Sequence, residues 1–119
     1  EALPSPRIMK THVPADAFPG LLRDSETALQ EFGRTVYVVR NPKDALVSLR
    51  HHHANNVSIA WSGSWEEWVD QWLVGARSGE YGGSYFEHVR AWWRQSRLHP
   101  QRVRIFYYEE MKADLAGAV

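Results

Sequence analysis

Two short segments of this 119-residue chain place basic side chains where they could act on an anionic substrate. The first segment is Lys10, Thr11 and His12. Because histidine titrates near neutral pH, His12 could take a proton from an attacking hydroxyl group. Lys10, on the same side of a predicted strand, could neutralise charge that develops on a leaving oxygen. Spacing alone favours a structural alternative, in which His12 caps the turn before Pro14 and Lys10 is solvated.

The second segment begins at Arg40 and Asn41, directly after the apolar run 35–39. Asn41 is a good N-cap and Pro42 suits the first helical position, so a helix is predicted to begin here. Free N–H groups at a helix N-terminus favour phosphate, and the guanidinium of Arg40 has fork geometry that matches phosphate oxygens. Ser48, about two turns along, could donate its hydroxyl to the same anion. On spacing alone it is equally plausible that Arg40 pairs with a carboxylate and Ser48 only packs.

The elements that must position these residues alternate between strands and helices. Segments 7–10, 35–39 and 103–108 have the composition of strands; 35–39 is a continuous β-branched and aromatic run typical of a strand buried on both faces, and 103–108 is predicted to be another buried strand. Ser-x-x-Glu capping boxes begin helices at Ser64 and Ser84. Helices are expected at 21–32, 42–52, from 64 to before 79, 84–98 and 109–115. This order predicts an α/β fold with a parallel sheet flanked by helices and ligand sites beyond the carboxyl ends of its strands.

Composition excludes several other classes of protein. With 44% hydrophobic and 24% charged residues the chain suits one soluble domain, and 14 basic against 14 acidic residues argue against a nucleic-acid binder. There is no cysteine and no apolar run near the roughly 20 residues that would span a membrane. His51, His52 and His53 suggest a metal site, but helical metal ligands are spaced by three or four positions, so no metal is expected. The six tryptophans fall at helical spacing and are mostly predicted to be core residues.

The ordered motifs resemble one enzyme family along nearly the whole chain. They are Arg-Ile-Met-Lys-Thr-His-Val-Pro at 7–14, the run from Val36 to Ser48, Gly-Ser-Tyr-Phe-Glu-His-Val at 83–89, and Phe-Tyr-Tyr-Glu-Glu-Met-Lys at 106–112. In this order they resemble the cytosolic-type PAPS-dependent sulfotransferases. The resemblance implies that 1–119 is the central part of a single sulfotransferase domain, with a fold related to P-loop nucleotide kinases. It also implies a cytoplasmic enzyme.

The resemblance implies a role for each candidate residue. His12 would be the general base and Lys10 would lie next to the transferred sulfuryl group. Arg40 and Ser48 would bind the 3′-phosphate of PAPS (3′-phosphoadenosine 5′-phosphosulfate), and Tyr108 would contact this co-substrate as well. No metal is implied. Because in-line sulfuryl transfer resembles phosphoryl transfer, positioning and charge stabilisation should dominate catalysis.

The resemblance also implies a small-molecule acceptor with a hydroxyl or amine group, contacted by Lys10, Thr11, His12 and His52. Where the family often has aromatic acceptor-pocket residues, this chain has Arg-His-His-His at 50–53. We therefore expect a more polar acceptor than a simple phenol. No nucleic-acid or membrane partner is expected, and a homodimer would use segments outside this chain.

Three family segments are expected beyond the ends of this chain. They are a 5′-phosphosulfate loop of Lys-Ser-Gly-Thr-Thr type before residue 1, and an Arg-Lys-Gly segment and a dimerisation segment after residue 119. The chain alone is therefore expected to be inactive. Two alternatives stay open: a catalytically inactive relative that only binds the nucleotide, and a carbohydrate sulfotransferase. The Lys-Thr-His segment argues against the second, because those enzymes usually have a carboxylate base.

Overall fold

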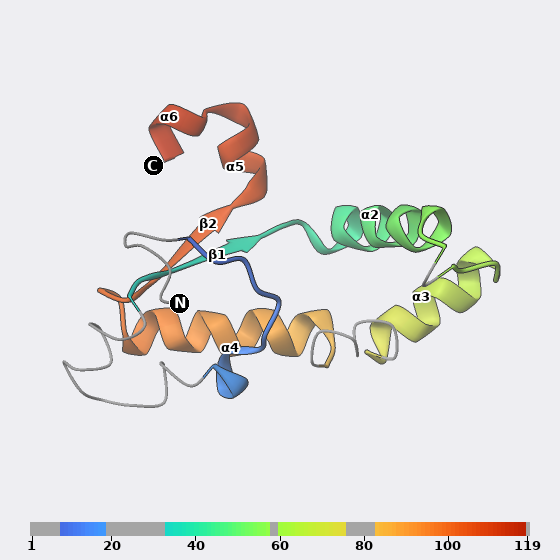
Figure 1. The fold of residues 1–119 in the computed structure, drawn as a ribbon, viewed down its shortest axis with the longest axis horizontal. Coiled ribbons are helices and arrows are strands. Elements are labelled where there is room, and N and C mark those ends of the chain that lie inside the picture. Colours follow the sequence, from blue (N-terminus) through green and yellow to red (C-terminus); the bar gives the residue numbers. More distant parts are fainter. Residues whose placement is uncertain (1–7, 19–32, 58–59, 76–82, 119) are drawn as a thin grey trace, which may run out of the picture.

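The computed structural model describes residues 8–18, 33–57, 60–75 and 83–118. Within these ranges two parallel strands, β1 (Thr35–Val39) and β2 (Val103–Tyr107), form a sheet that is accompanied by helices (Figure 1). The predicted α/β class with a parallel sheet flanked by helices is therefore confirmed. No helix in this part of the chain is long and apolar enough to cross a membrane.

The helices are η1 (Ala15–Ala17), α2 (Pro42–Asn55), α3 (Trp65–Leu73), α4 (Tyr85–Leu98), α5 (Tyr108–Ala113) and α6 (Leu115–Ala118). Of these, α2, α3 and α4 begin where their capping residues predict. Both predicted capping boxes are present. The hydroxyl of Ser84 accepts the N–H of Glu87 at 3.2 Å, and the carboxylate of Glu87 accepts the N–H of Ser84 at 3.2 Å. Ser64 and Glu67 form the same pair before α3. Local hydrogen bonds therefore determine where these helices begin.

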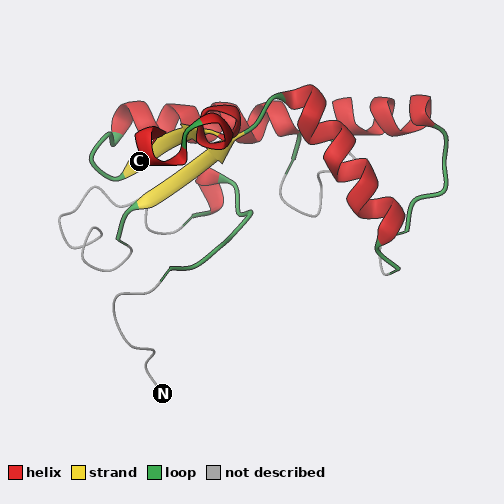
Figure 2. Ribbon diagram, turned by 90° about the horizontal axis from the view of Figure 1, so that it is seen from above, coloured by secondary structure: helices red, strands yellow, loops and turns green. Residues whose placement is uncertain are grey.

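The main core lies between α4 and one face of the sheet, with α2 and α3 extending beyond the carboxyl end of β1 (Figures 1 and 2). Trp92 of α4 is only 3% exposed and packs with Val103 and Ala15. The ring of Tyr37 from β1 stacks on Trp92, with centroids 5.5 Å apart and an interplanar angle of 16°. Phe18 meets the same indole edge-on at 5.9 Å. The segment that follows His12 is thus attached to α4.

A second cluster of aromatic side chains joins α2, α3 and α4. Trp68 is fully buried, lies 5.1 Å from the ring of His53, and donates its indole N–H to the carbonyl of Leu46 at 3.3 Å. Trp72 stacks on Tyr85 at 5.3 Å, which connects α3 to the start of α4. Of the six tryptophans, three are buried, Trp68, Trp72 and Trp92, so the expected core role holds for half of them.

Two strand predictions are wrong. Residues 8–10 are not a strand, and Ile8 is fully and Met9 mostly exposed, because no neighbouring strand in the described part of the chain pairs with them. The predicted burial of both sheet faces is also wrong, since Val36 and Val38 are 61% and 45% exposed. These side chains lie on the sheet face opposite the core of α4, and the described residues cover them only in part. The helix predicted at 21–32 lies outside the described residues.

Candidate functional site

The parallel pairing of β1 and β2 ends at Val39 and Tyr107, and the residues that follow the two strands also lie close together. Arg40 lies opposite Tyr108, and its guanidinium carbon is 4.7 Å from the centre of the Tyr108 ring. One residue further, the N–H of Asn41 donates to the carboxylate of Glu109 at 2.8 Å. Strand pairing therefore brings together two of the predicted co-substrate residues, Arg40 and Tyr108.

Arg40 is the cation at this edge of the sheet. Within the described ranges its side chain forms no ion pair, and its buried Nε has no hydrogen-bond partner. The hydroxyl of Tyr85, on the first turn of α4, donates to the carbonyl of Arg40 and so holds its main chain. The pKa of Glu109 is lowered, first because its carboxylate accepts the N–H of Asn41 and in addition because of the positive charge of Arg40. A guanidinium that forms no close ion pair within the described ranges is suited to binding an anionic ligand.

The prediction that free backbone amides of α2 bind an anion is wrong for the first positions of that helix. The N–H of Asn41 is bonded to Glu109, and the N–H of Lys43 donates to the side chain of Asn41 at 2.9 Å. Pro42 has no N–H. The carboxylate of Glu109 and the side-chain oxygen of Asn41 accept hydrogen bonds from these two N–H groups, as an anion would. The side chain of Arg40 is therefore the better candidate for phosphate binding.

The predicted catalytic segment forms an exposed, extended stretch instead of a strand end. Thr11 accepts the N–H of Val13 on its hydroxyl at 3.1 Å, and the carbonyl oxygen of His12 lies 3.2 Å from Nε2 of His88. The pKa of His12 is lowered, first by partial burial and then by the positive charges of Lys10 and His88. A lowered pKa favours the neutral imidazole at pH 7, which is the form that a general base requires.

The first turn of α4 contacts both predicted segments. Tyr85 bonds to the main chain of Arg40, and three residues later His88 lies 3.0 Å from the hydroxyl of Tyr37 and 3.2 Å from the carbonyl of His12. Residues spaced by three share one helix face. Sequence reasoning missed both Tyr85 and His88. The Ser84 capping box placed them on the first turn, but nothing local indicated what that turn would face.

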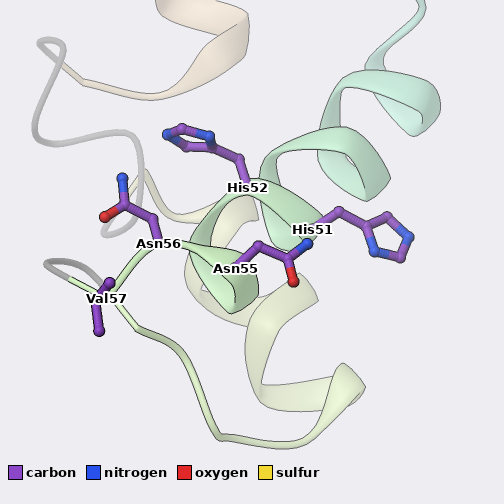
Figure 3. Close-up of a pocket in the computed structure, with 5 residues that line it drawn as sticks. All are labelled: His51, His52, Asn55, Asn56 and Val57. Atoms are coloured by element: carbon purple, nitrogen blue, oxygen red, sulfur yellow. The ribbon is translucent and has the colours of Figure 1, made fainter.

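His52, predicted to contact the acceptor, lies at the carboxyl end of α2. There, His51, His52, Asn55, Asn56 and Val57 line an open depression (Figure 3). Figure 3 shows the rings of His51 and His52 pointing in different directions. Four of the five lining residues have polar side chains, although more of the lining surface is apolar than polar. It therefore offers hydrogen-bonding groups rather than an aromatic wall.

His53 and Ser48, the other two candidate residues of α2, do not line this depression. His53 is 2% exposed and packs on Trp68, so the three consecutive histidines do not converge. In the described part of the chain, no three histidine, aspartate or glutamate side chains are grouped as metal ligands. Ser48 is exposed on α2, and its phosphate-binding role stays a prediction.

The sequence profile of the sulfotransferase domain matches residues 1–119. The chain belongs to the sulfotransferase family. This sulfotransferase chain is 38% identical to mouse Sulfotransferase 1B1 over 109 residues, which are 92% of the chain and 33% of that relative. It is 32% identical to human Sulfotransferase 1C2 over 114 residues, 96% of the chain and 35% of that relative. The chain thus spans about a third of the length of the curated relatives it matches.

A solved structure is also similar to this sulfotransferase chain. The crystal structure of mouse sulfotransferase SULT7A1 complexed with PAP matches it with a TM-score of 0.63 and 32% identity. The match covers 76% of this chain and 31% of that structure. The two-stranded sheet and its helices therefore form part of a sulfotransferase fold.

Proposed function

We propose that the protein containing this chain transfers a sulfuryl group from PAPS to a hydroxyl or amine of a small molecule. The observation that supports this most is the double attachment of the first turn of α4. Tyr85 holds the main chain of Arg40, and His88 contacts the main chain of His12. A cation suited to phosphate and a histidine suited to proton transfer are thereby attached to one helical turn. The solved relative that is complexed with PAP supports the nucleotide class.

In the proposed reaction His12 acts as general base. It removes the proton of the acceptor while the acceptor oxygen or nitrogen forms a bond to sulfur. The bond between sulfur and the phosphate oxygen of PAPS breaks, and its electron pair stays on the phosphate of the product PAP. Lys10 neutralises the charge that develops on that oxygen. Arg40 and Ser48 bind the 3′-phosphate, and Tyr108 supports the same end of the nucleotide.

We propose a polar acceptor, because the depression near His52 presents imidazole and carboxamide groups. Such groups recognise hydroxyl, amine or carboxylate substituents by hydrogen bonds, which an aromatic wall would not provide. Lys10, Thr11 and His12 would contact the reacting end of the acceptor, and His52 its more distant part.

The test uses the full-length gene product, PAPS labelled on sulfur, and a panel of phenols, alcohols, amines and polar hydroxy compounds. We expect labelled product with at least one acceptor, and a loss of transfer of about a hundredfold or more in His12→Ala, as for other general bases. Arg40→Ala should weaken PAP binding, whereas Arg94→Ala, at an exposed position of α4, should not. Undiminished transfer in His12→Ala would refute the base assignment. Nucleotide binding without transfer to any acceptor would identify an inactive relative.

A further inference from the structure

The ring of His88 connects β1 to the segment that contains His12. Its Nδ1 lies 3.0 Å from the hydroxyl oxygen of Tyr37, and its Nε2 lies 3.2 Å from the carbonyl oxygen of His12. A carbonyl oxygen can only accept a hydrogen bond, so Nε2 must carry the hydrogen in this contact. Nδ1 is then free to accept the O–H of Tyr37. A His88 ring with its hydrogen on Nε2 thus satisfies both partners at once.

Tyr37 is a rigid support for this ring. Its own ring stacks on the buried Trp92 at 5.5 Å and lies 5.6 Å from the ring of His88. Burial raises the pKa of the Tyr37 hydroxyl well above its usual value of 10.0. The hydroxyl therefore keeps its proton and stays a donor to Nδ1 at any pH at which an enzyme of this kind would be assayed. The orientation of His88 is consequently determined from the sheet side.

The segment around His12 is packed in the core on its carboxyl-terminal side and is exposed on its amino-terminal side. Toward the carboxyl end, Ala15 is 1% exposed and packs in the core with Trp92. Toward the amino end, Ile8 is fully exposed and Met9 is 76% exposed. His12 lies between the packed and the exposed part. The hydrogen bond between His88 and the carbonyl of His12 therefore holds the main chain of His12 at the boundary between these two parts.

We propose that His88 is a positioning residue for the base His12. It acts through the main chain of His12 and does not itself exchange a proton with the acceptor. This inference rests on the proposed function, in which His12 is the base. A general base must lie within about 2.6–3.2 Å of the proton that it takes. Because a misplacement of about 1 Å can reduce the rate about a hundredfold, loss of the main-chain contact should lower turnover.

Two isosteric replacements separate the contacts of the ring. His88→Asn places an amide group near Nδ1, so it can still accept the Tyr37 hydroxyl but cannot reach the carbonyl of His12. His88→Gln places an amide nitrogen near Nε2 and can still donate to that carbonyl. In the full-length protein we expect His88→Asn to lower kcat about ten- to hundredfold, with the affinity for PAP and the unfolding midpoint little changed. His88→Gln should retain kcat within about fivefold.

A double-mutant cycle gives the decisive readout. If His88 acts through His12, then His88→Asn should lower the residual transfer by His12→Ala by less than about twofold, because the base it positions is already absent. Tyr37→Phe keeps the ring that packs on Trp92 and removes only the hydroxyl, so it should give a partial loss of kcat in the wild-type background. It keeps the proposal testable if a His88 variant does not fold.

The outcomes separate this inference from the proposed function. If His12→Ala leaves transfer unchanged, the assignment of the base fails and the positioning role fails with it. If His12→Ala abolishes transfer but His88→Asn leaves kcat unchanged, only the positioning role fails. Equal losses of kcat, PAP affinity and thermal stability in both His88 variants would indicate a purely structural residue. So would an undiminished effect of His88→Asn in the His12→Ala background.

Discussion

Tyr108 could support nucleotide binding in two ways, through its hydroxyl group or through the face of its ring. The ring is the stronger candidate, because the guanidinium carbon of Arg40 lies 4.7 Å from the ring centre and has no ion-pair partner in the described ranges. A ring in this place limits the orientations of the guanidinium and leaves its outer N–H groups to a phosphate. We therefore predict that Tyr108→Phe preserves the affinity for PAP and that Tyr108→Ala does not.

The size of the effect follows from the exposure of the site. Tyr108 is 37% exposed, and a cation over an aromatic ring at an exposed site contributes about 0.5–1 kcal/mol. At about 1.4 kcal/mol per tenfold change, Tyr108→Ala should raise the Kd for PAP about two- to fivefold. Arg40→Ala removes charged hydrogen bonds of about 1.5–3 kcal/mol in total, so the Kd should rise about ten- to hundredfold.

Titration calorimetry with PAP on the full-length protein measures these constants. A cycle of Arg40→Ala and Tyr108→Ala tests whether the two residues act together, because Tyr108→Ala should have little further effect once the guanidinium is gone. If Tyr108→Phe weakens PAP as much as Tyr108→Ala does, the hydroxyl makes the contact and the reasoning from the ring is refuted. Unchanged affinity in Arg40→Ala would refute the phosphate assignment itself.

Three further predictions concern stability and pH. Trp92→Ala should lower the free energy of unfolding of the full-length protein by about 3–5 kcal/mol in urea titrations. Trp93→Ala, at a position 49% exposed, should cost about 1 kcal/mol or less. Similar losses in both would contradict the burial pattern. Ser84→Ala should cost about 1 kcal/mol by removing the N-cap of α4, whereas Ser84→Gly should cost only a few tenths. Finally, kcat/KM should rise with pH as His12 loses its proton, at a pH below its usual pKa of 6.5, because burial and the charges of Lys10 and His88 lower that pKa. Lys10→Met removes one positive charge, so this rise should move to higher pH while the overall rate falls. A shift to lower pH, or none, would contradict the electrostatic argument.

The starts of the helices could be predicted because their causes are local. Ser64 and Ser84 are followed three residues later by glutamates that complete the capping boxes, and Asn41 and Pro42 begin α2 as expected. The helix after residue 42 continues to Asn55, three residues beyond the prediction, since nothing in the run of histidines ends it. Such signals need no knowledge of the rest of the fold.

The strand environments could not be predicted in the same way. The run Val36 to Val39 has the composition of a strand buried on both faces, yet burial depends on what packs against each face. The segment at 8–10 lacks a pairing partner in the described part of the chain and is therefore no strand. The composition of a segment indicates a preference for strand structure, but pairing and packing with distant segments determine whether the strand forms and which of its faces are buried.

The contacts of the candidate site, too, depend on distant segments that local sequence does not reveal. The contact between Arg40 and Tyr108 requires the register of two strands that are separated by three helices. Neither residue type nor spacing reveals that register, so the pair was expected only from the family resemblance. The amide of Asn41 is bonded to the distant carboxylate of Glu109, which nothing near Asn41 in the sequence indicates, whereas the amide of Lys43 is bonded to the local N-cap side chain of Asn41.

One face of α4 connects both Arg40 and His12 to the core. Tyr85, His88 and Trp92 follow one another at spacings of three and four, so they lie along one side of the helix. The first holds the main chain of Arg40, the second contacts His12, and the third is buried against the sheet. A change that loosens Trp92 must therefore also displace His88, one turn away, and through it the base. The exposed face of the sheet, with Val36 and Val38, has no such connection, since these side chains point away from α4. Core substitutions on the α4 side should thus affect catalysis as well as stability, and substitutions on the opposite face should affect stability alone.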